Sequence, residues 1–235
     1  MPTHKVVTHE DWVEARKTLL AKEKEFTRAR DQLSKSRREL PWEKVEKNYV
    51  FDGSKGKETL SDLFDGRSQL IVYHFMYGPG WEEGCQSCSF IADHFNPAIV
   101  HLNHRDVTMV AISKAPLKEL EAFKKRMGWS FKWVSSFEND FNRDYHVSFT
   151  EEETDAGKVY YNYKYMKFPS TEAPGASVFY KDEKGDIFHT YSVYERGLDM
   201  FIGAYHYLDI VPKGRDEDNL SWTMEWLRLH DAYDN

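Results

Sequence analysis

The sequence predicts an α/β fold in which a central sheet is flanked by helices and preceded by a long N-terminal helical arm. Apolar runs at 69–76 and 106–113 have the length and composition of buried strands, and segments with helical spacing follow them at 89–95 and 116–127. A strand–helix–strand–helix order implies a parallel sheet built by right-handed crossovers. Residues 8–39 are mostly polar with a narrow apolar stripe, which is typical of a long surface helix.

The composition indicates one large globular domain, or one domain with extensions. The chain has 235 residues, of which 40% are hydrophobic and 15% aromatic, enough to build a core. A formal charge of −7 gives no support for binding nucleic acid. No run approaches the length of a membrane-spanning helix, and Met1–Lys5 lacks the apolar stretch of a signal peptide. We therefore expect a cytoplasmic location and no membrane association.

The arm at residues 1–41 is expected to contain one helix over 8–39. Thr8 can cap this helix, with Asp11 three positions later, and Pro41 ends it. Its apolar residues recur every seven positions: Trp12, Leu19, Phe26, Leu33 and Leu40. This stripe suits either a helix that lies across its own domain or a helix that packs against a second subunit to form a homodimer.

The remaining segments form a domain at 42–211 and a tail at 212–235. Residues 150–172 are polar and rich in tyrosine, and we expect them to be an irregular insertion. Trp222, Trp226 and Leu229 indicate that the tail is docked rather than free. The other expected elements are a strand and turn at 49–57, a helical turn at 60–64, a hairpin of strands at 177–180 and 186–193, and a helix at 197–208.

The only two cysteines, Cys85 and Cys88, have C-x-x-C spacing and lie between the strand at 69–76 and the helix at 89–95. A pair in this place is the signature of a thioredoxin-like dithiol site. We expect Cys85 at the helix N-terminus, where exposed backbone N–H groups stabilise a thiolate and make it the nucleophile. Cys88, three residues later, would then resolve the mixed disulfide. This arrangement predicts thiol–disulfide exchange with a protein or small-molecule thiol or disulfide, without a cofactor.

The order of elements is the thioredoxin-like plan with a peroxiredoxin-style leading hairpin. Six stretches carry a more specific signal: Tyr73-His74-Phe75-Met76, Gly84-Cys85-Gln86-Ser87-Cys88-Ser89-Phe90, Trp133-Val134-Ser135-Ser136, Asp140-Phe141-Asn142, Phe188-His189-Thr190-Tyr191-Ser192 and Arg196-Gly197-Leu198-Asp199-Met200. Together they resemble the domain of unknown function 899 family over nearly the whole chain. Members of that family are described as predicted dithiol–disulfide oxidoreductases with a thioredoxin-like fold, so the resemblance implies this fold and this class of activity.

The resemblance to thioredoxin-like proteins also implies roles for three residues. In such proteins a cis-proline before the corresponding strand faces the cysteine pair and presents backbone to the substrate, which implies that Pro174, with Gly175 after it, binds substrate. His74 lies on the strand that leads to the cysteines, where thioredoxins carry a buried acid for proton transfer, and an imidazole could do that work. The alternatives are a trans proline at a strand start and a hydrogen-bonded core histidine.

The segment before Cys85 differs from the usual thioredoxin approach. It is a longer, Gly-rich loop at 77–84, which could form a lip over the site with Trp81 as its apolar surface, or could be an ordinary loop. Glu82 and Glu83 precede the motif, and negative charge there opposes thiolate formation. We therefore do not expect a strongly oxidising protein.

A metal site is one alternative for the cysteine pair. Together with His101 and His104, the pair nearly matches the ligand spacing of a zinc finger. The two histidines, however, are one residue too close to each other, and Pro97 interrupts the helix that would carry them. A copper or zinc site that uses the pair with a distant histidine such as His189 is a second form of this alternative. We expect the chain to bind no metal.

Two further alternatives concern activity. A peroxiredoxin needs Pro-x-x-x-Thr-x-x-Cys, and Glu82 stands where the threonine is required before Cys85, which disfavours peroxide reduction of that kind. A binding or assembly module that retains the fold is the non-enzymatic alternative. It rests on the arm and on a tyrosine cluster that could equally be local packing: Tyr160, Tyr161, Tyr163 and Tyr165.

Overall fold

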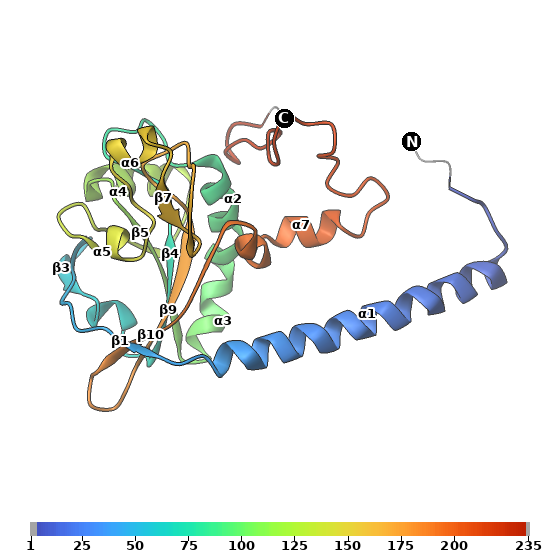
Figure 1. The fold of residues 1–235 in the computed structure, drawn as a ribbon, viewed down its shortest axis with the longest axis horizontal. Helices are drawn as coiled ribbons and strands as arrows, with labels where there is room; N and C mark the ends of the chain where they lie inside the picture. The colour runs from blue at the N-terminus through green and yellow to red at the C-terminus, as the bar shows by residue number, and fades with distance from the viewer. Residues whose placement is uncertain (1–3, 234–235) are drawn as a thin grey trace. The chain divides into compact units, whose positions relative to one another are not determined.

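The computed structural model describes residues 4–233, and the chain divides into two compact units, one ending at Pro41 and one starting at Trp42 (Figure 1). The first unit contains α1 (His9–Arg38), a helix of 30 residues. The Thr8 hydroxyl accepts a hydrogen bond from the backbone N–H of Asp11 at 3.2 Å, which satisfies one of the free donors at the helix start. The expected helix is present, and none of its residues is buried.

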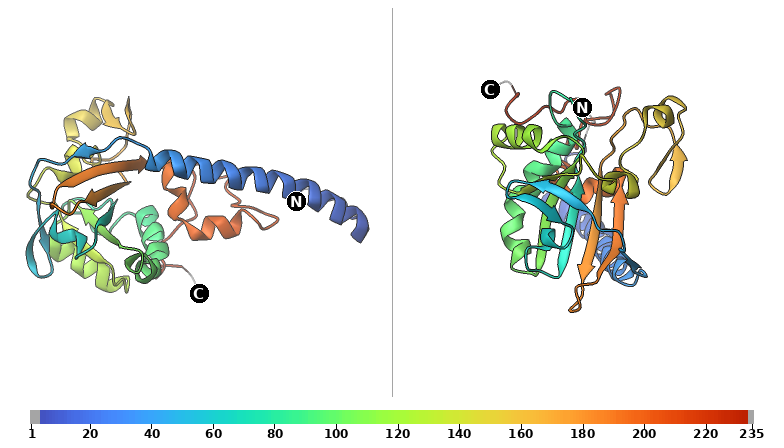
Figure 2. Two further views of the ribbon diagram at one scale, coloured as in Figure 1. Left: turned by 90° about the horizontal axis from the view of Figure 1, so that it is seen from below. Right: turned by 90° about the vertical axis from the view of Figure 1, so that its left-hand side faces the viewer.

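The second unit is built on a mixed sheet of eight strands within residues 42–233 (Figure 2). The spatial order of the strands is β1 (Glu43–Lys44), β10 (Ile187–Tyr194), β9 (Gly175–Lys181), β4 (Gln69–His74), β5 (Val107–Ser113), β6 (Lys132–Ser135), β2 (Val50–Gly53) and β3 (Gly56–Thr59). The three central strands β4, β5 and β6 run parallel. At their two sides the pairing is antiparallel, β9 with β4 and β2 with β6.

Helices cover one face of this sheet. From β4 the chain passes through α2 (Gln86–Phe95), a 3-10 turn (Asn96–Ala98) and α3 (Ile99–Asn103) to β5, and then through α4 (Leu117–Arg126) to β6. Tyr73 of β4 and Phe75 just beyond it pack in one apolar cluster with Ile91 of α2 and Phe123 of α4. Burial of these large side chains holds the helices to the sheet.

The opposite face has its own apolar cluster, because successive side chains along a strand point to opposite faces. Leu70 and Val72 of β4 lie in this second cluster, together with Phe64 and Phe141. Phe64 belongs to a 3-10 turn (Asp62–Phe64), and Phe141 begins the short helix α5 (Phe141–Asp144). β4 is thus buried on both faces, which explains its continuous apolar run.

The connectivity identifies the fold class. A β4–α2–β5 crossover is followed by an antiparallel β9–β10 hairpin beside β4, in the spatial order β5-β4-β9-β10. This is the thioredoxin-like arrangement, and β2 with β3 supplies the leading hairpin. The predicted fold class is confirmed.

Two expected segments differ from the structure. Residues 150–172 are not irregular throughout, since they contain α6 (Glu151–Asp155), β7 (Val159–Tyr161) and β8 (Lys164–Met166). Reciprocal hydrogen bonds between Thr150 and Glu153 form a capping box that starts α6. The expected helix at 197–208 is two pieces, a 3-10 helix (Glu195–Phe201) and α7 (Gly203–Leu208), because Ile202 between them leaves helical geometry with ψ of 87°.

Candidate active site

The cysteines lie where the chain leaves the sheet and enters α2. Cys85 is the N-cap residue, with φ of −54° and ψ of 129°, and Cys88 lies inside the first turn of the helix. The backbone N–H of Cys85 donates to the carbonyl of Met76 at 3.1 Å, and the N–H of Ser89 donates to the carbonyl of Cys85 at 2.9 Å. These bonds hold Cys85 between the end of β4 and the start of α2.

The two thiols have different environments. Both are free, but Cys85 is partly exposed whereas Cys88 is buried. A hydrogen bond from the Cys88 thiol lowers the pKa of Cys85 from 9.0 to about 7, helped by the backbone N–H groups of Cys88 and Ser87, although burial acts against this. Burial raises the pKa of Cys88 above its ordinary value, and the adjacent Cys85 adds to the effect. Cys85 is therefore the better thiolate of the pair.

We expect the alkylation rate of Cys85 by iodoacetamide to have a pH midpoint near 7. Only the thiolate reacts. A thiol with a pKa of 9.0 would be about 1% ionised at pH 7, whereas a pKa of about 7 gives about one half. The rate should rise as the pH increases through 7 and should level off before pH 9. Mass spectrometry of the alkylated peptide assigns the site, and a midpoint near 9 would contradict the shift.

The acids before Cys85 are paired or exposed to solvent. Glu83 forms an ion pair with Arg126, which also contacts Asp231 at 2.7 Å, and Glu82 is exposed to solvent. Their charges are thus paired or screened by water. The pKa of Cys85 is lowered with both acids in place, chiefly by the hydrogen bond from Cys88.

Both cysteines line a pocket of about 440 Å³. Its walls come from α2, from the insertion at 150–172, from the segment before β9, and from the C-terminal part of the chain. The residues that line it are Tyr73, Met76, Cys85, Ser87, Cys88, Ile91, Tyr161, Phe168, Pro174, Glu195, Arg196, Leu198, Asp199, Ile202, Thr223 and Met224.

Pro174 is one of these lining residues, but its peptide bond is trans, since no cis peptide bond occurs within residues 4–233. The cis form expected from thioredoxin-like proteins is therefore absent at this position. The hydroxyl of Tyr161 donates to the Pro174 carbonyl at 2.6 Å, which ties β7 of the insertion to the pocket wall. Gly175 lies outside the lining, where its backbone packs so closely on Tyr194 that a Cβ would lie 2.8 Å from the ring.

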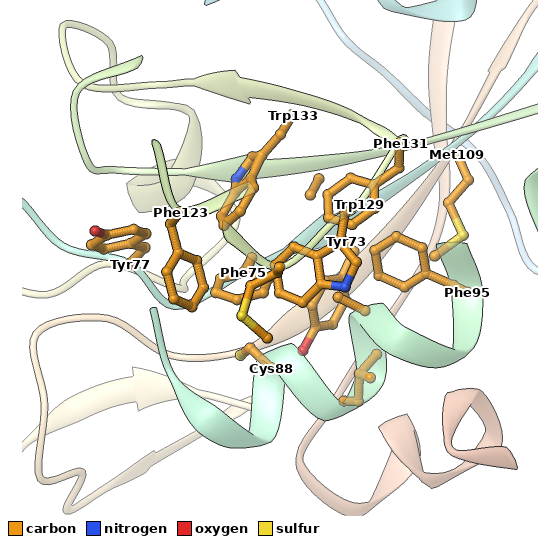
Figure 3. Close-up of a cluster of buried hydrophobic side chains, with 14 of the residues drawn as sticks. Tyr73, Phe75, Tyr77, Cys88, Phe95, Met109, Phe123, Trp129, Phe131 and Trp133 are labelled. Atoms are coloured by element: carbon orange, nitrogen blue, oxygen red, sulfur yellow. The ribbon is translucent and has the colours of Figure 1, made fainter. Parts of the chain in front are cut away.

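Tyr73 is the polar group that adjoins the dithiol. Its side chain is fully buried in the cluster that contains Phe75 and Cys88 (Figure 3). Burial raises its pKa well above the ordinary value, and the neighbouring Cys88 adds to the shift, so the hydroxyl keeps its proton. The hydroxyl interacts with the Cys88 thiol, and Tyr73 is one of the residues that line the pocket.

His74 points to the other face of β4. Its ring stacks on Tyr145 with centroids 6.0 Å apart, and its Nε2 is 2.8 Å from the Ser177 hydroxyl. Burial lowers the pKa of His74 to about 3, so the ring is neutral. His74 does not line the pocket of the cysteines, and Tyr73 occupies the place beside them. The proton-transfer role of His74 stays a prediction that this placement does not favour.

Trp81 also lies outside the lining of the pocket. Its indole packs over Gly78, where a Cβ would lie 2.8 Å from Nε1. The contact fixes the loop at 77–84 but does not place Trp81 over the cysteines. The role of Trp81 as a lip over the site stays a prediction.

Sequence reasoning did not identify four of the residues that form the pocket walls: Tyr73, Tyr161, Phe168 and Met224. Tyr73 stands at the start of one of the stretches that resemble the family, which was a usable signal. Tyr161 was noticed only as a member of a tyrosine cluster. Phe168 and Met224 carry no local pattern that points to a site.

Residues 4–233 contain neither a cluster of metal ligands nor a helix suited to a membrane. Among residues 4–233, no group of three or more His, Cys, Asp or Glu side chains is placed to hold a metal ion. His189, named above as a candidate ligand, is bonded through Nε2 to the Ser192 hydroxyl at 2.7 Å. In the same range, no helix is both long and apolar enough to cross a membrane.

The topology and the two cysteines define a thioredoxin-like protein with a free dithiol at a helix N-terminus. The chain belongs to the family described as bacterial protein of unknown function (DUF899), which matches residues 1–233. The resemblance seen in the sequence is thereby confirmed. A comparison with curated proteins finds no match.

Solved structures with a similar fold share little sequence with this chain. Peroxidoxin BcpB from Mycobacterium tuberculosis is 13% identical, with a TM-score of 0.47, and the match covers 69% of this chain and 94% of that one. A PrxQ mutant from Xylella fastidiosa is 12% identical, with a TM-score of 0.44 over 71% and 95% of the two chains. A Chlorobium tepidum protein proposed to be the thiol:disulfide interchange protein DsbE is 14% identical, with a TM-score of 0.42 over 70% and 97%. The similarity is one of fold.

Proposed function

We propose that this protein is a thiol–disulfide oxidoreductase in which Cys85 is the nucleophile and Cys88 the resolving thiol. The observation that carries the proposal is the asymmetry of the pair. Cys85 caps α2, is partly exposed and has a lowered pKa, whereas Cys88 is buried one turn later and has a raised pKa. An exposed low-pKa thiolate beside a protonated partner is the arrangement that disulfide exchange requires.

The reaction proceeds in two displacements. The Cys85 thiolate attacks one sulfur of a substrate disulfide, its S–S bond breaks, and the first substrate thiolate leaves. Cys88 then gives up its proton and attacks the Cys85 sulfur, which closes the Cys85–Cys88 disulfide and releases the second thiolate. The substrate gains two electrons and the cysteine pair loses two, so an external dithiol must reduce the pair before the next cycle.

Counting free thiols tests this proposal. The purified protein should show two reactive thiols after reduction with dithiothreitol, and none after oxidation with diamide followed by unfolding. A pair that never closes would end the oxidoreductase proposal and favour the binding or assembly module. A stoichiometric metal in the same sample would favour the alternative of a cysteine–histidine metal site.

Pro174 is proposed to shape the substrate groove. Its place in the pocket with both cysteines supports this role, and so does the hydrogen bond from Tyr161 that fixes its carbonyl. A cytoplasmic location also belongs to the proposal, because a reducing compartment keeps such a pair available as thiols.

The arm is proposed to pair with a second copy of the chain through its heptad stripe. Four stripe residues in α1 are half exposed or more: Trp12 at 55%, Leu19 at 51%, Phe26 at 69% and Leu33 at 51%. Identical stripes on two helices are complementary to each other, and their contact would remove apolar surface from water.

We expect the wild-type protein to be a dimer in solution and Phe26→Glu to be a monomer. A charge at the centre of the stripe would be buried without a partner in the dimer. Thr27→Glu is the matched control, because Thr27 is exposed next to the stripe but outside it. Light scattering gives the mass of each variant, and a wild-type mass equal to one chain would remove the dimer proposal.

A further inference from the structure

The pocket at the cysteines has the properties of a small-molecule site. Its volume of about 440 Å³ lies within the range of about 300–1,000 Å³ that is usual for ligand pockets. Three of its walls are apolar: Ile91 of α2, Tyr161 and Phe168 of the insertion, and Met224 of the C-terminal segment. The last two walls come from segments outside the central strand–helix units of the fold.

The charged residues of the pocket are already paired with other protein groups. Arg196 binds Asp199 at 2.8 Å, and Asp199 also binds Arg215 at 3.1 Å. Glu195 accepts a hydrogen bond from Asn162 at 2.5 Å and lies 3.9 Å from Lys164. An uncharged substrate would leave these pairs intact and would be held mainly by the apolar walls.

The Tyr73 hydroxyl, which is the polar group beside the dithiol, adds no charge to the pocket. It is fully buried and interacts with the Cys88 thiol. Burial raises its pKa well above the ordinary value, so it keeps its proton. The apolar walls therefore supply most of the surface that a substrate would contact beside Cys88.

From these observations we infer that the substrate is a small, uncharged and largely apolar disulfide rather than a protein disulfide. This inference rests on the proposed function and specifies its substrate class. Cys85 attacks one sulfur of the bound disulfide, and the first thiol product leaves with a proton from solvent. Cys88 then closes the protein disulfide and releases the second thiol, while a soluble dithiol such as dithiothreitol returns the two electrons.

Two probes of equal length test the inference: dipropyl disulfide, which is uncharged, and 3,3′-dithiodipropionate, which carries two carboxylates. The reduced full-length protein is mixed with each, and closure of the Cys85–Cys88 disulfide is followed by the loss of protein thiols, which are alkylated at set times and counted by mass spectrometry of the protein. Each rate is divided by the rate of free dithiothreitol with the same probe. We expect this ratio to be about tenfold or more in favour of dipropyl disulfide, because the propyl groups leave water for apolar walls. Reduction of insulin, as a protein disulfide, should be slower still after the same correction.

A charge in the apolar wall provides the variant test. Met224→Glu should lower the corrected rate with dipropyl disulfide by about tenfold, because a carboxylate keeps water in the pocket. Met200→Glu is the matched control, since Met200 is exposed and does not line the pocket. In both variants Cys85 should still be alkylated by iodoacetamide, which shows that the thiol chemistry is intact.

The outcomes separate the two proposals. Equal corrected rates for the two small probes, or faster reduction of insulin, would overturn the inferred substrate class while disulfide closure still supports the oxidoreductase. An unchanged rate in Met224→Glu would also overturn it. Failure of the pair to close with any of the three disulfides would instead overturn the proposed function.

Discussion

Replacing Cys85 by serine should abolish disulfide exchange. Cys85 is the partly exposed thiol at the start of α2, and it alone of the two has a lowered pKa. Serine has no accessible anion at neutral pH, so the first displacement cannot begin. Reduction of a small disulfide, followed by the consumption of dithiothreitol, should fall to the rate measured without protein.

Replacing Cys88 by serine should have a different result, because Cys88 acts only in the second displacement. The first step should still occur, and the substrate should remain attached to Cys85 as a mixed disulfide that mass spectrometry detects. Gln86→Ala is the control for both variants, since Gln86 lies between the cysteines with an exposed side chain. Equal residual activity of the two serine variants would show that the assigned roles are wrong.

The elements that were predicted well depend on local patterns. The strand at 69–76 and the helix at 116–127 were recognised from continuous apolar runs and from helical spacing, and they are β4 (Gln69–His74) and α4 (Leu117–Arg126). The place of Cys85 at the start of α2 followed from the same patterns. Short elements were missed, because β6 (Lys132–Ser135) has four residues and offers no period to detect.

The pocket could not be predicted in this way because its walls are far apart in the chain. Phe168 and Met224 meet near Cys88 only through the folding of the insertion and the C-terminal segment. His74 and Tyr73 illustrate a second limit. The alternation of side chains predicts that these neighbours point to opposite faces of the sheet. It does not say which face carries α2, so the sequence alone does not show that Tyr73, and not His74, lines the pocket of the cysteines.

The loop that precedes Cys85 packs tightly against the core, and Gly84 is the residue in close contact. A Cβ on this residue would lie 2.7 Å from Cε1 of Phe123 and 2.8 Å from Cε1 of Phe75. Both rings are buried, Phe75 with an exposed fraction of 1% and Phe123 with 4%, and they are held by further aromatic contacts. They cannot turn away as an exposed flexible side chain would, so an added methyl group must displace either the rings or the backbone that precedes Cys85.

Gly84→Ala should therefore lower the free energy of unfolding by about 1–3 kcal/mol, the usual cost of overpacking a core. It should also raise the pH midpoint of Cys85 alkylation, because a shift of the preceding residue moves the thiolate away from the N–H groups of α2. Gln86→Ala is the control, because Gln86 is the other neighbour of Cys85 and its side chain is exposed. Urea unfolding and the alkylation profile measure the two effects. If Gly84→Ala left both unchanged, the fit of the loop against Phe75 and Phe123 would have no part in placing Cys85.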